Sequence, residues 1–248
     1  MPLAVPPGAF PGAAYLPGSD VLRLPDGRLR YVPPGARRPV TAPPGDPGAL
    51  AAAARTRAWL ERGAVPGSDG AERAIAARSL LNIRLLVLPG GAAIAAARDR
   101  WDYVWPRDAG WMAAALAATG HHAESRAVLR FLARTQLPDG TWEARYRPDG
   151  SPVLDGRAPQ LDANGWFLWS LWLHTRTGDR WGDARELWPA ARWAADAAAG
   201  SLGPDGLPPA GADYWERETL YPNLGTAAPL RAGLRAAADV ARGLGHRR

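Results

Sequence analysis

Hydrophobic positions follow a helical spacing through most of the chain. From Ala49 onward, alanine, leucine and tryptophan recur at intervals of three and four residues, and glycine or proline interrupts the pattern between segments. The segments expected to form helices are 49–62, 72–88, 107–119, 122–136, 161–177, 181–199 and 226–243. Very short connections at 119–121 and 177–179 join neighbouring segments into antiparallel hairpins. A series of helical hairpins predicts an all-α fold of the α/α toroid or solenoid type.

The first 48 residues follow a different pattern. They are rich in proline and glycine, and short alternations of apolar and polar residues flank the turn at 25–27. This pattern predicts a small β-hairpin or an irregular arm. We therefore expect two parts, an N-terminal arm over 1–48 and a helical domain over 49–248.

Two connections between the predicted helices are long. The connection 137–160 contains two Asp-Gly turns around the segment 141–146, a pattern that predicts a β-hairpin. The connection 200–225 places aromatic and acidic residues side by side. Because long loops on a scaffold of short turns often bind ligands, we expect these connections to form the functional face.

The segment Trp101–Asp108, with the sequence WDYVWPRD, combines three aromatic residues with an Arg-Asp pair directly before a predicted helix. Aromatic faces stack on the apolar faces of sugar rings, and an arginine next to an aspartate offers hydroxyl groups both donors and acceptors. The composition of this segment therefore favours a carbohydrate-binding pocket.

Three acidic residues begin predicted helices or lie in the loop before one. For Asp108 and Asp162, helix capping is one possible role, because backbone N–H groups and the helix dipole favour carboxylates at helix N-termini. Glu216 follows Trp215, and packing against an indole would raise the pKa of its carboxyl by desolvation. A carboxyl with a raised pKa is suited to donate a proton, so Glu216 is the candidate acid.

Three runs in the second part of the chain resemble a known family. They are GAAIAAARDRWDYVWPRDAGW, GRAPQLDANGW and ADYWERETLYPNLGTAAPL, over residues 91–111, 156–166 and 212–230. In order and approximate spacing they are similar to glycoside hydrolase family fifteen, the family of glucoamylases, glucodextranases and certain trehalases. The resemblance covers roughly residues 72–245 and implies an (α/α)6 barrel, of which this chain would form the N-terminal half.

The resemblance also implies an activity, the inverting hydrolysis of α-glucosidic bonds from non-reducing ends. In that family the general acid follows a tryptophan, and Trp215-Glu216 matches this motif, so Glu216 would protonate the glycosidic oxygen. The residues that the resemblance assigns to substrate binding are Tyr103, Trp105, Arg107, Asp108, Gln160, Asp162 and Trp215. Tyr103 and Trp105 would stack on or flank the terminal glucose, and the Arg-Asp pair would bond its hydroxyls.

The chain departs from the family pattern at two points. Arg217 stands where relatives have a second glutamate, with Glu218 one position later, which leaves the identity of the substrate open. An inverting glycosidase also needs a carboxylate as general base, and in the family this base lies in the second half of the barrel, to which no residue here corresponds. Half a toroid would expose apolar helix faces, so self-association or a covering partner is expected.

The amino-acid composition limits the kinds of ligand and partner that the chain is expected to bind. The formal charge is +6, but the basic residues are all arginine and are scattered among acids, so we expect no nucleic acid partner. The chain has no cysteine, its four histidines lack metal-ligand spacing, and it has no lysine for a phosphate-binding loop, so we expect no metal and no cofactor.

The sequence also indicates a location. The N-terminus lacks a basic region followed by an apolar run, and no apolar stretch reaches the roughly 20 residues of a membrane span. We expect a cytoplasmic protein that does not bind membranes.

Three functional interpretations remain open. The chain is a glucoamylase-like glycosidase or half of one; alternatively, it is a non-catalytic sugar-binding or regulatory module that lacks the base. The third interpretation is a helical interaction protein without a sugar pocket, since a fold does not fix a function. Release of glucose from α-glucosides, or saturable sugar binding without release, separates the three.

Overall fold

The chain folds into two compact units in a computed structural model that describes residues 11–34, 36, 38–98, 100–212 and 216–246. The first unit comprises Met1–Leu86 and Ala96–Trp101, and the second comprises Val87–Ala95 and Asp102–Arg248. These units are defined by contacts between residues. The division into 1–48 and 49–248, which rests on composition, stays a prediction.

A small antiparallel sheet begins the first unit. Its strands are β1 (Ala14–Tyr15), β2 (Leu22–Arg23), β3 (Leu29–Tyr31) and β4 (Val40–Ala42), in that spatial order. The turn between β2 and β3 contains Gly27, whose φ of +83° lies in the left-handed region that glycine adopts without strain. The predicted hairpin around residues 25–27 is thus confirmed as the centre of a four-stranded sheet.

Two helices complete the first unit, α1 (Pro47–Glu61) and α2 (Gly70–Leu86). The Asp46 side chain caps α1 by accepting a hydrogen bond of 2.8 Å from the backbone N–H of Ala49. Small residues on one face of α1, among them Ala49 and Ala53, pack on Val21 and Leu29 of the sheet region. The sheet therefore rests on a helix that the sequence analysis assigned to the other part of the chain.

Five helices form the second unit. They are α3 (Pro106–Ala118), α4 (His122–Thr135), α5 (Asp162–Gly178), α6 (Trp181–Gly200) and α7 (Leu224–Gly243). Together with α1 and α2, they confirm the seven predicted helices to within a few residues at each end. The helix-rich architecture with one small sheet is consistent with the predicted all-α fold class, and the type of barrel stays a prediction.

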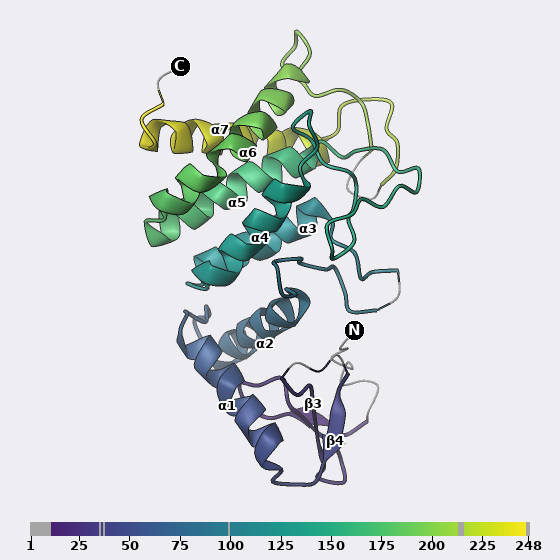
Figure 1. The fold of residues 1–248 in the computed structure, drawn as a ribbon, viewed down its shortest axis with the longest axis vertical. Helices are drawn as coiled ribbons and strands as arrows, with labels where there is room; N and C mark the ends of the chain where they lie inside the picture. Colours follow the sequence, from purple (N-terminus) through teal and green to yellow (C-terminus); the bar gives the residue numbers. More distant parts are fainter. Residues whose placement is uncertain (1–10, 35, 37, 99, 213–215, 247–248) are drawn as a thin grey trace. The chain divides into compact units, whose positions relative to one another are not determined.

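The helix α5 lies at the centre of the second unit and packs most extensively on α7 and α3 (Figure 1). Glycine makes the closest approach between helices possible. A Cβ atom at Gly165 would lie 2.3 Å from the backbone carbonyl of Pro229, and a Cβ at Gly233 would lie 2.5 Å from the oxygen of Gly165. Backbone therefore contacts backbone where α5 crosses α7, and this contact fixes the two helices relative to each other.

Both Asp-Gly turns that flank the segment 141–146 form, and a short antiparallel hairpin closes the second one, where Tyr146 pairs with Pro152. The same tyrosine also pairs with Val104, in the loop before α3, which the sequence did not predict. The reason lies in its side chains: Trp142 and Tyr146 are buried, and the Trp142 indole donates to the carbonyl of Leu132 at the end of α4. Burial of these rings against the helices sets the path of the chain, so the segment pairs with the loop before α3.

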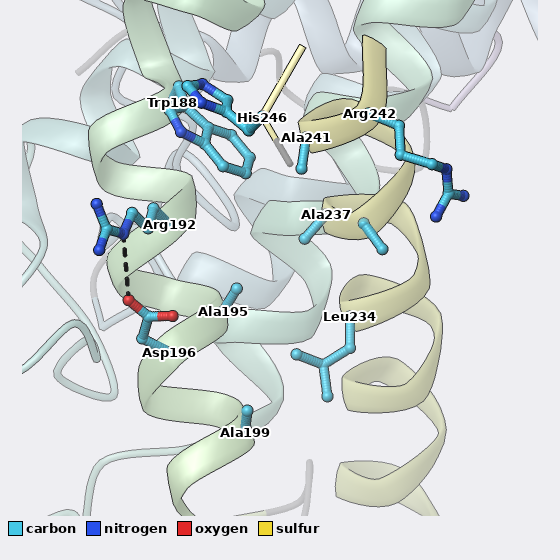
Figure 2. Close-up of a pocket in the computed structure, with 11 residues that line it drawn as sticks. Trp188, Arg192, Ala195, Asp196, Ala199, Leu234, Ala237, Ala241, Arg242 and His246 are labelled. Atoms are coloured by element: carbon cyan, nitrogen blue, oxygen red, sulfur yellow. Dashed lines mark ion pairs between the residues drawn. The ribbon is translucent and has the colours of Figure 1, made fainter. Parts of the chain in front are cut away.

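An apolar groove runs between α6 and α7 on the outside of the second unit (Figure 2). It encloses about 880 Å³ and is lined mainly by small and aliphatic side chains, with Trp188 stacked on His246 at one end at a centroid distance of 5.0 Å. Ala195 and Ala199 of α6 face Leu234 and the alanines of α7 across it.

In the part of the chain that the structure describes, none of the helices combines the length and the hydropathy that a membrane span requires.

Candidate active site

Three loops meet at one end of the second unit. They precede α3, α5 and α7, so the N-termini of these three helices point toward the same cluster of loops (Figure 1). Trp105, Gln160 and Glu216 lie in these loops, and hydrogen bonds join all three. Motifs separated by more than fifty residues in the sequence therefore form one group of side chains.

Glu216 is held by donors on both carboxylate oxygens. The indole Nε1 of Trp105 donates to Oε1 at 2.7 Å, and the amide of Gln160 donates to the same oxygen at 3.4 Å. The guanidinium Nε of Arg157 donates to Oε2. Since the Trp105 side chain is buried and the Glu216 side chain is 22% exposed, the carboxylate lies at the wall of the site with access to solvent.

Arg107 links the loop before α3 to the start of α5. Its Nη1 donates to Gln160 Oε1 at 2.8 Å and to Asp162 Oδ2 at 2.9 Å. The Asp162 side chain is 5% exposed, so its charge is taken from water and is compensated mainly by this arginine. The pair also orients the Gln160 amide toward Glu216, because its carbonyl oxygen is occupied by Arg107.

The remaining binding candidates lie around this group. The rings of Tyr103 and Trp105 meet edge to face, with centroids 6.1 Å apart. The guanidinium of Arg145 lies over both rings, 4.6 Å from the Tyr103 centroid and 5.3 Å from that of Trp105. Trp215 lies outside the described residues, and Arg217 and Glu218 are exposed.

Burial dominates the electrostatics of the two aspartates. Desolvation raises the pKa of Asp108 above its ordinary value despite the neighbouring Arg107, and the Glu216 charge acts in the same direction. Desolvation likewise raises the pKa of Asp162, against the opposing effect of Arg107. Neither aspartate caps its helix, because the capping residues are Trp105 and Leu161 and no side chain bonds there.

The pKa of Glu216 corrects the expectation from the sequence. Burial alone would raise this pKa, but the hydrogen bonds from Trp105 and Arg157 outweigh it and hold the pKa below its ordinary value. The sequence pointed to an apolar indole face, whereas the structure presents Glu216 with an indole N–H and a cation. Glu216 is therefore a stabilised carboxylate.

The backbone of Glu216 is also unusual. Its φ is +60°, in the left-handed region that residues with a Cβ rarely occupy. This conformation costs on the order of 1 kcal/mol and persists only where surrounding contacts determine it. The bonds from Trp105 and Arg157 to the two carboxylate oxygens provide such contacts.

Sequence reasoning missed two arginines at the site. Arg157 and Arg145 both pair with Asp155, which lies between them in the loop before α5. The available signal was the position of Arg157 within the matched run 156–166, three residues before Gln160. Among the residues that the structure describes, no group of three or more potential ligands is arranged to hold a metal ion.

Comparisons with known proteins give the site a context. No model of a known protein family matches the chain. An uncharacterized glycosyl hydrolase of Methanocaldococcus jannaschii is 35% identical over 109 residues, which is 43% of this chain and 17% of the length of that relative.

Several solved structures share the fold. A variant of a glycosidase is 22% identical with a TM-score of 0.53, covering 71% of this chain and 58% of that chain. The wild-type glycosidase is 21% identical, with a TM-score of 0.50 and coverages of 66% and 54%. A polysaccharide lyase is 16% identical, with a TM-score of 0.53 and coverages of 72% and 56%.

The chain therefore spans a small part of its curated relative and slightly more than half of each solved structure. The sequence relative supports a glycoside hydrolase-like protein. At these identities the solved structures show the likeness of the fold alone.

Proposed function

We propose that this chain forms the sugar-binding wall of a glycosidase active site and supplies its general acid. The substrates are α-glucosides or α-glucans, hydrolysed from their non-reducing ends with inversion, as in glycoside hydrolase family fifteen. The bond between Trp105 and Glu216, 2.7 Å long, is the observation that carries the proposal. It brings the candidate acid to the aromatic segment that sequence composition associates with sugar binding.

Each residue has a role in this proposal. Glu216 donates a proton to the glycosidic oxygen, and Trp105 and Gln160 hold its carboxyl. Tyr103 flanks the terminal glucose. The ion pair with Asp162 fixes the Arg107 guanidinium at the site, where the proposal assigns it to donate to sugar hydroxyls.

Asp108 complements these donors. Its raised pKa favours a carboxyl that exchanges hydrogen bonds with sugar hydroxyls in a desolvated pocket. Trp215, the motif tryptophan beside Glu216, is proposed as a further wall of the subsite.

Inversion requires a second carboxylate about 6.5 to 9.5 Å from the acid, with a water between them. The family resemblance assigns this base to a segment that no residue of the chain matches. Sugar binding and proton donation are therefore tested separately from complete turnover.

The first experiment measures binding of glucose, maltose and trehalose by titration calorimetry and, in the same samples, the release of glucose. We expect saturable binding that Asp108→Asn weakens at least tenfold, because a buried carboxyl that bonds a hydroxyl is lost. The matched control is Asp26→Asn, in the turn between β2 and β3, whose side chain is 50% exposed. Equal binding by both variants, or no binding by the wild type, would contradict the assignment of the pocket.

The alternative is a sugar-binding module without catalysis. The lowered pKa of Glu216 favours it, because a carboxylate that is ionised at neutral pH is a poor acid. Saturable binding without glucose release supports the module. Glucose release that Glu216→Gln abolishes and Glu186→Gln leaves intact supports the enzyme.

We also propose that a second copy of the chain covers the groove between α6 and α7, because apolar surface of this kind favours association. The test measures molar mass by light scattering for Ala238→Glu, which places a charge in the groove, and for Ala228→Glu, on an exposed position of α7 that does not line it. Ala238→Glu should lower the mass at equal concentration. A monomeric wild type contradicts this proposal.

A further inference from the structure

Arg157 has an unusual position for an arginine in a long loop. Its guanidinium contacts two carboxylates at once, with Nε on Glu216 Oε2 and Nη1 on Asp155. The loop is separated from Glu216 by 59 positions along the chain, so the fold brings this cation to the candidate acid. The proposed reaction assigns no role to Arg157.

We propose that Arg157 is a positioning residue that holds Glu216 while the site is empty and passes wholly to Asp155 when a sugar enters. This inference rests on the proposed function and adds a step to it. Once the guanidinium has moved, Glu216 Oε2 takes up a proton from solvent and gives it to the glycosidic oxygen as the bond to the leaving group breaks.

The engagement of both Glu216 oxygens favours such a step. Oε1 accepts from Trp105 and Gln160, and Oε2 accepts from Arg157. A general acid must present a protonated oxygen to the leaving group, and a guanidinium bonded to that oxygen stabilises the ionised carboxylate and so opposes its protonation. Because Trp105 is buried, whereas the Arg157 side chain is 35% exposed, Arg157 is the donor that can move.

Asp155 provides the second position for the guanidinium. It is anchored by Arg145, whose side chain is 12% exposed and lies over the rings of Tyr103 and Trp105. Asp155, the carboxylate that would receive Arg157, is thus held by Arg145 next to the rings of Tyr103 and Trp105. The movement breaks the ion pair with Glu216 and strengthens the one with Asp155, and the proton that Glu216 takes up neutralises the carboxylate that has lost its cation.

The other charged groups near Glu216 are accounted for. Asp108 lies close enough for the two carboxyls to interact, and Arg107 reaches Glu216 through Gln160. Neither group contacts Glu216 directly in the described contacts. Arg157 is therefore the cation whose removal should alter the titration of Glu216 most strongly.

The test titrates the Glu216 side chain by carbon-13 carboxyl NMR in the full chain, with the resonance assigned from Glu216→Gln. Without sugar, R157Q should raise the titration midpoint by about one pH unit, and R157K should restore part of the wild-type midpoint. R147Q removes an exposed arginine of the same loop, which bonds only loop backbone in the contacts described, and should leave the midpoint unchanged. An unchanged midpoint in R157Q overturns the holding contact.

The second arm repeats the titration with saturating maltose. The wild-type midpoint should rise toward that of R157Q, because the sugar displaces the guanidinium, whereas R157Q should change little. A wild-type midpoint that does not move although maltose binds overturns the transfer. Failure of maltose to bind overturns the proposed function and the transfer with it, whereas the arm without sugar still decides the holding contact.

Discussion

The indole N–H of Trp105 donates to Glu216 Oε1 across 111 positions of the sequence, at a distance of 2.7 Å. One residue ends the loop before α3, and the other lies in the loop before α7. The bond therefore depends on the packing of α3, α5 and α7. A change in the packing of these helices would break it. A tryptophan at this position contributes a hydrogen-bond donor in addition to an aromatic face.

Replacing Trp105 by phenylalanine should raise the pKa of Glu216. The ring is retained but its N–H donor is lost, and this donor is the largest of the groups that lower the pKa. Carboxyl NMR titration of the variant measures the shift. Trp193→Phe, at a tryptophan that is 56% exposed on α6, is the control and should leave the Glu216 pKa as it is. A shift of equal size in both variants would show that the effect is not local.

Replacing Arg107 by alanine should lower the free energy of unfolding by about 3 kcal/mol at neutral pH, because Asp162 would remain buried without its cation. The pKa of Asp162 is already raised, and removal of Arg107 should raise it further. Since the folded protein then favours the protonated carboxyl, the loss should shrink as the pH falls toward the ordinary value of 3.8. Urea unfolding at several pH values measures both effects.

The control for Arg107 is Arg130→Ala. Arg130 pairs with Glu186 on the surface, where the two side chains are 46% and 44% exposed. Exposed pairs of this kind contribute little to stability, because solvent screens the two charges. Comparable losses for the two arginines would mean that the ion pair at the site is no more stabilising than a surface pair.

Gly165→Ala should destabilise the second unit by about 2 kcal/mol, because the added methyl meets the backbone of Pro229 at 2.3 Å and the crossing of α5 and α7 must widen. Gly182→Ala on α6 has nothing within 4 Å and should stabilise the helix by up to about 1 kcal/mol. Thermal unfolding of the two variants should move in opposite directions. If alanine stabilised the protein at both glycines, the backbones of α5 and α7 would not be in close contact at Gly165.

Acidification below pH 6.5 should destabilise the protein through His174. Burial lowers the pKa of this histidine, and the bond to Asp183 only partly offsets the effect. The unfolded chain therefore binds a proton at a higher pH than the folded chain, so stability falls as the pH drops through 6.5 toward the folded pKa. His122, Arg126 and Arg180 are the other groups that act on its charge; the pKa of His122 is itself lowered by burial.

The measurement compares unfolding free energies at pH 7.5 and pH 5.5. His174→Gln should be less stable than the wild type at pH 7.5 but should lose less on acidification. His246→Gln, at an exposed histidine stacked on Trp188, should keep the wild-type pH dependence. A wild-type slope retained in His174→Gln would assign the effect to another group.

The helices were predictable because apolar spacing, glycine and proline act locally. The long-range partner of the segment 141–146 was not predictable. The Asp-Gly turn after it indicated the local pairing of Tyr146 with Pro152, but not the burial of Trp142, Ala144 and Tyr146. The neighbour that they pack against comes from the loop before α3 and from α4, and nothing in the local pattern specifies it.

The site shows the same limit. Sequence motifs selected Arg107, Gln160 and Asp162, and the structure joins all three by hydrogen bonds. The sequence pattern could not predict the environment of Glu216. The cation that bonds its carboxylate comes from a distant loop, and no regular spacing of residues in that loop indicates the contact. Arg157 becomes visible only when three-dimensional contacts are known.

The left-handed backbone of Glu216 has a consequence for how this loop tolerates substitution. A glycine at this position would relax the main chain, so selection for thermal stability alone should favour replacing the residue that the proposed reaction needs most. A library screened for folding and a library screened for sugar hydrolysis should therefore diverge at position 216. The preference of each for glycine or for glutamate would measure how far function opposes stability at a single residue.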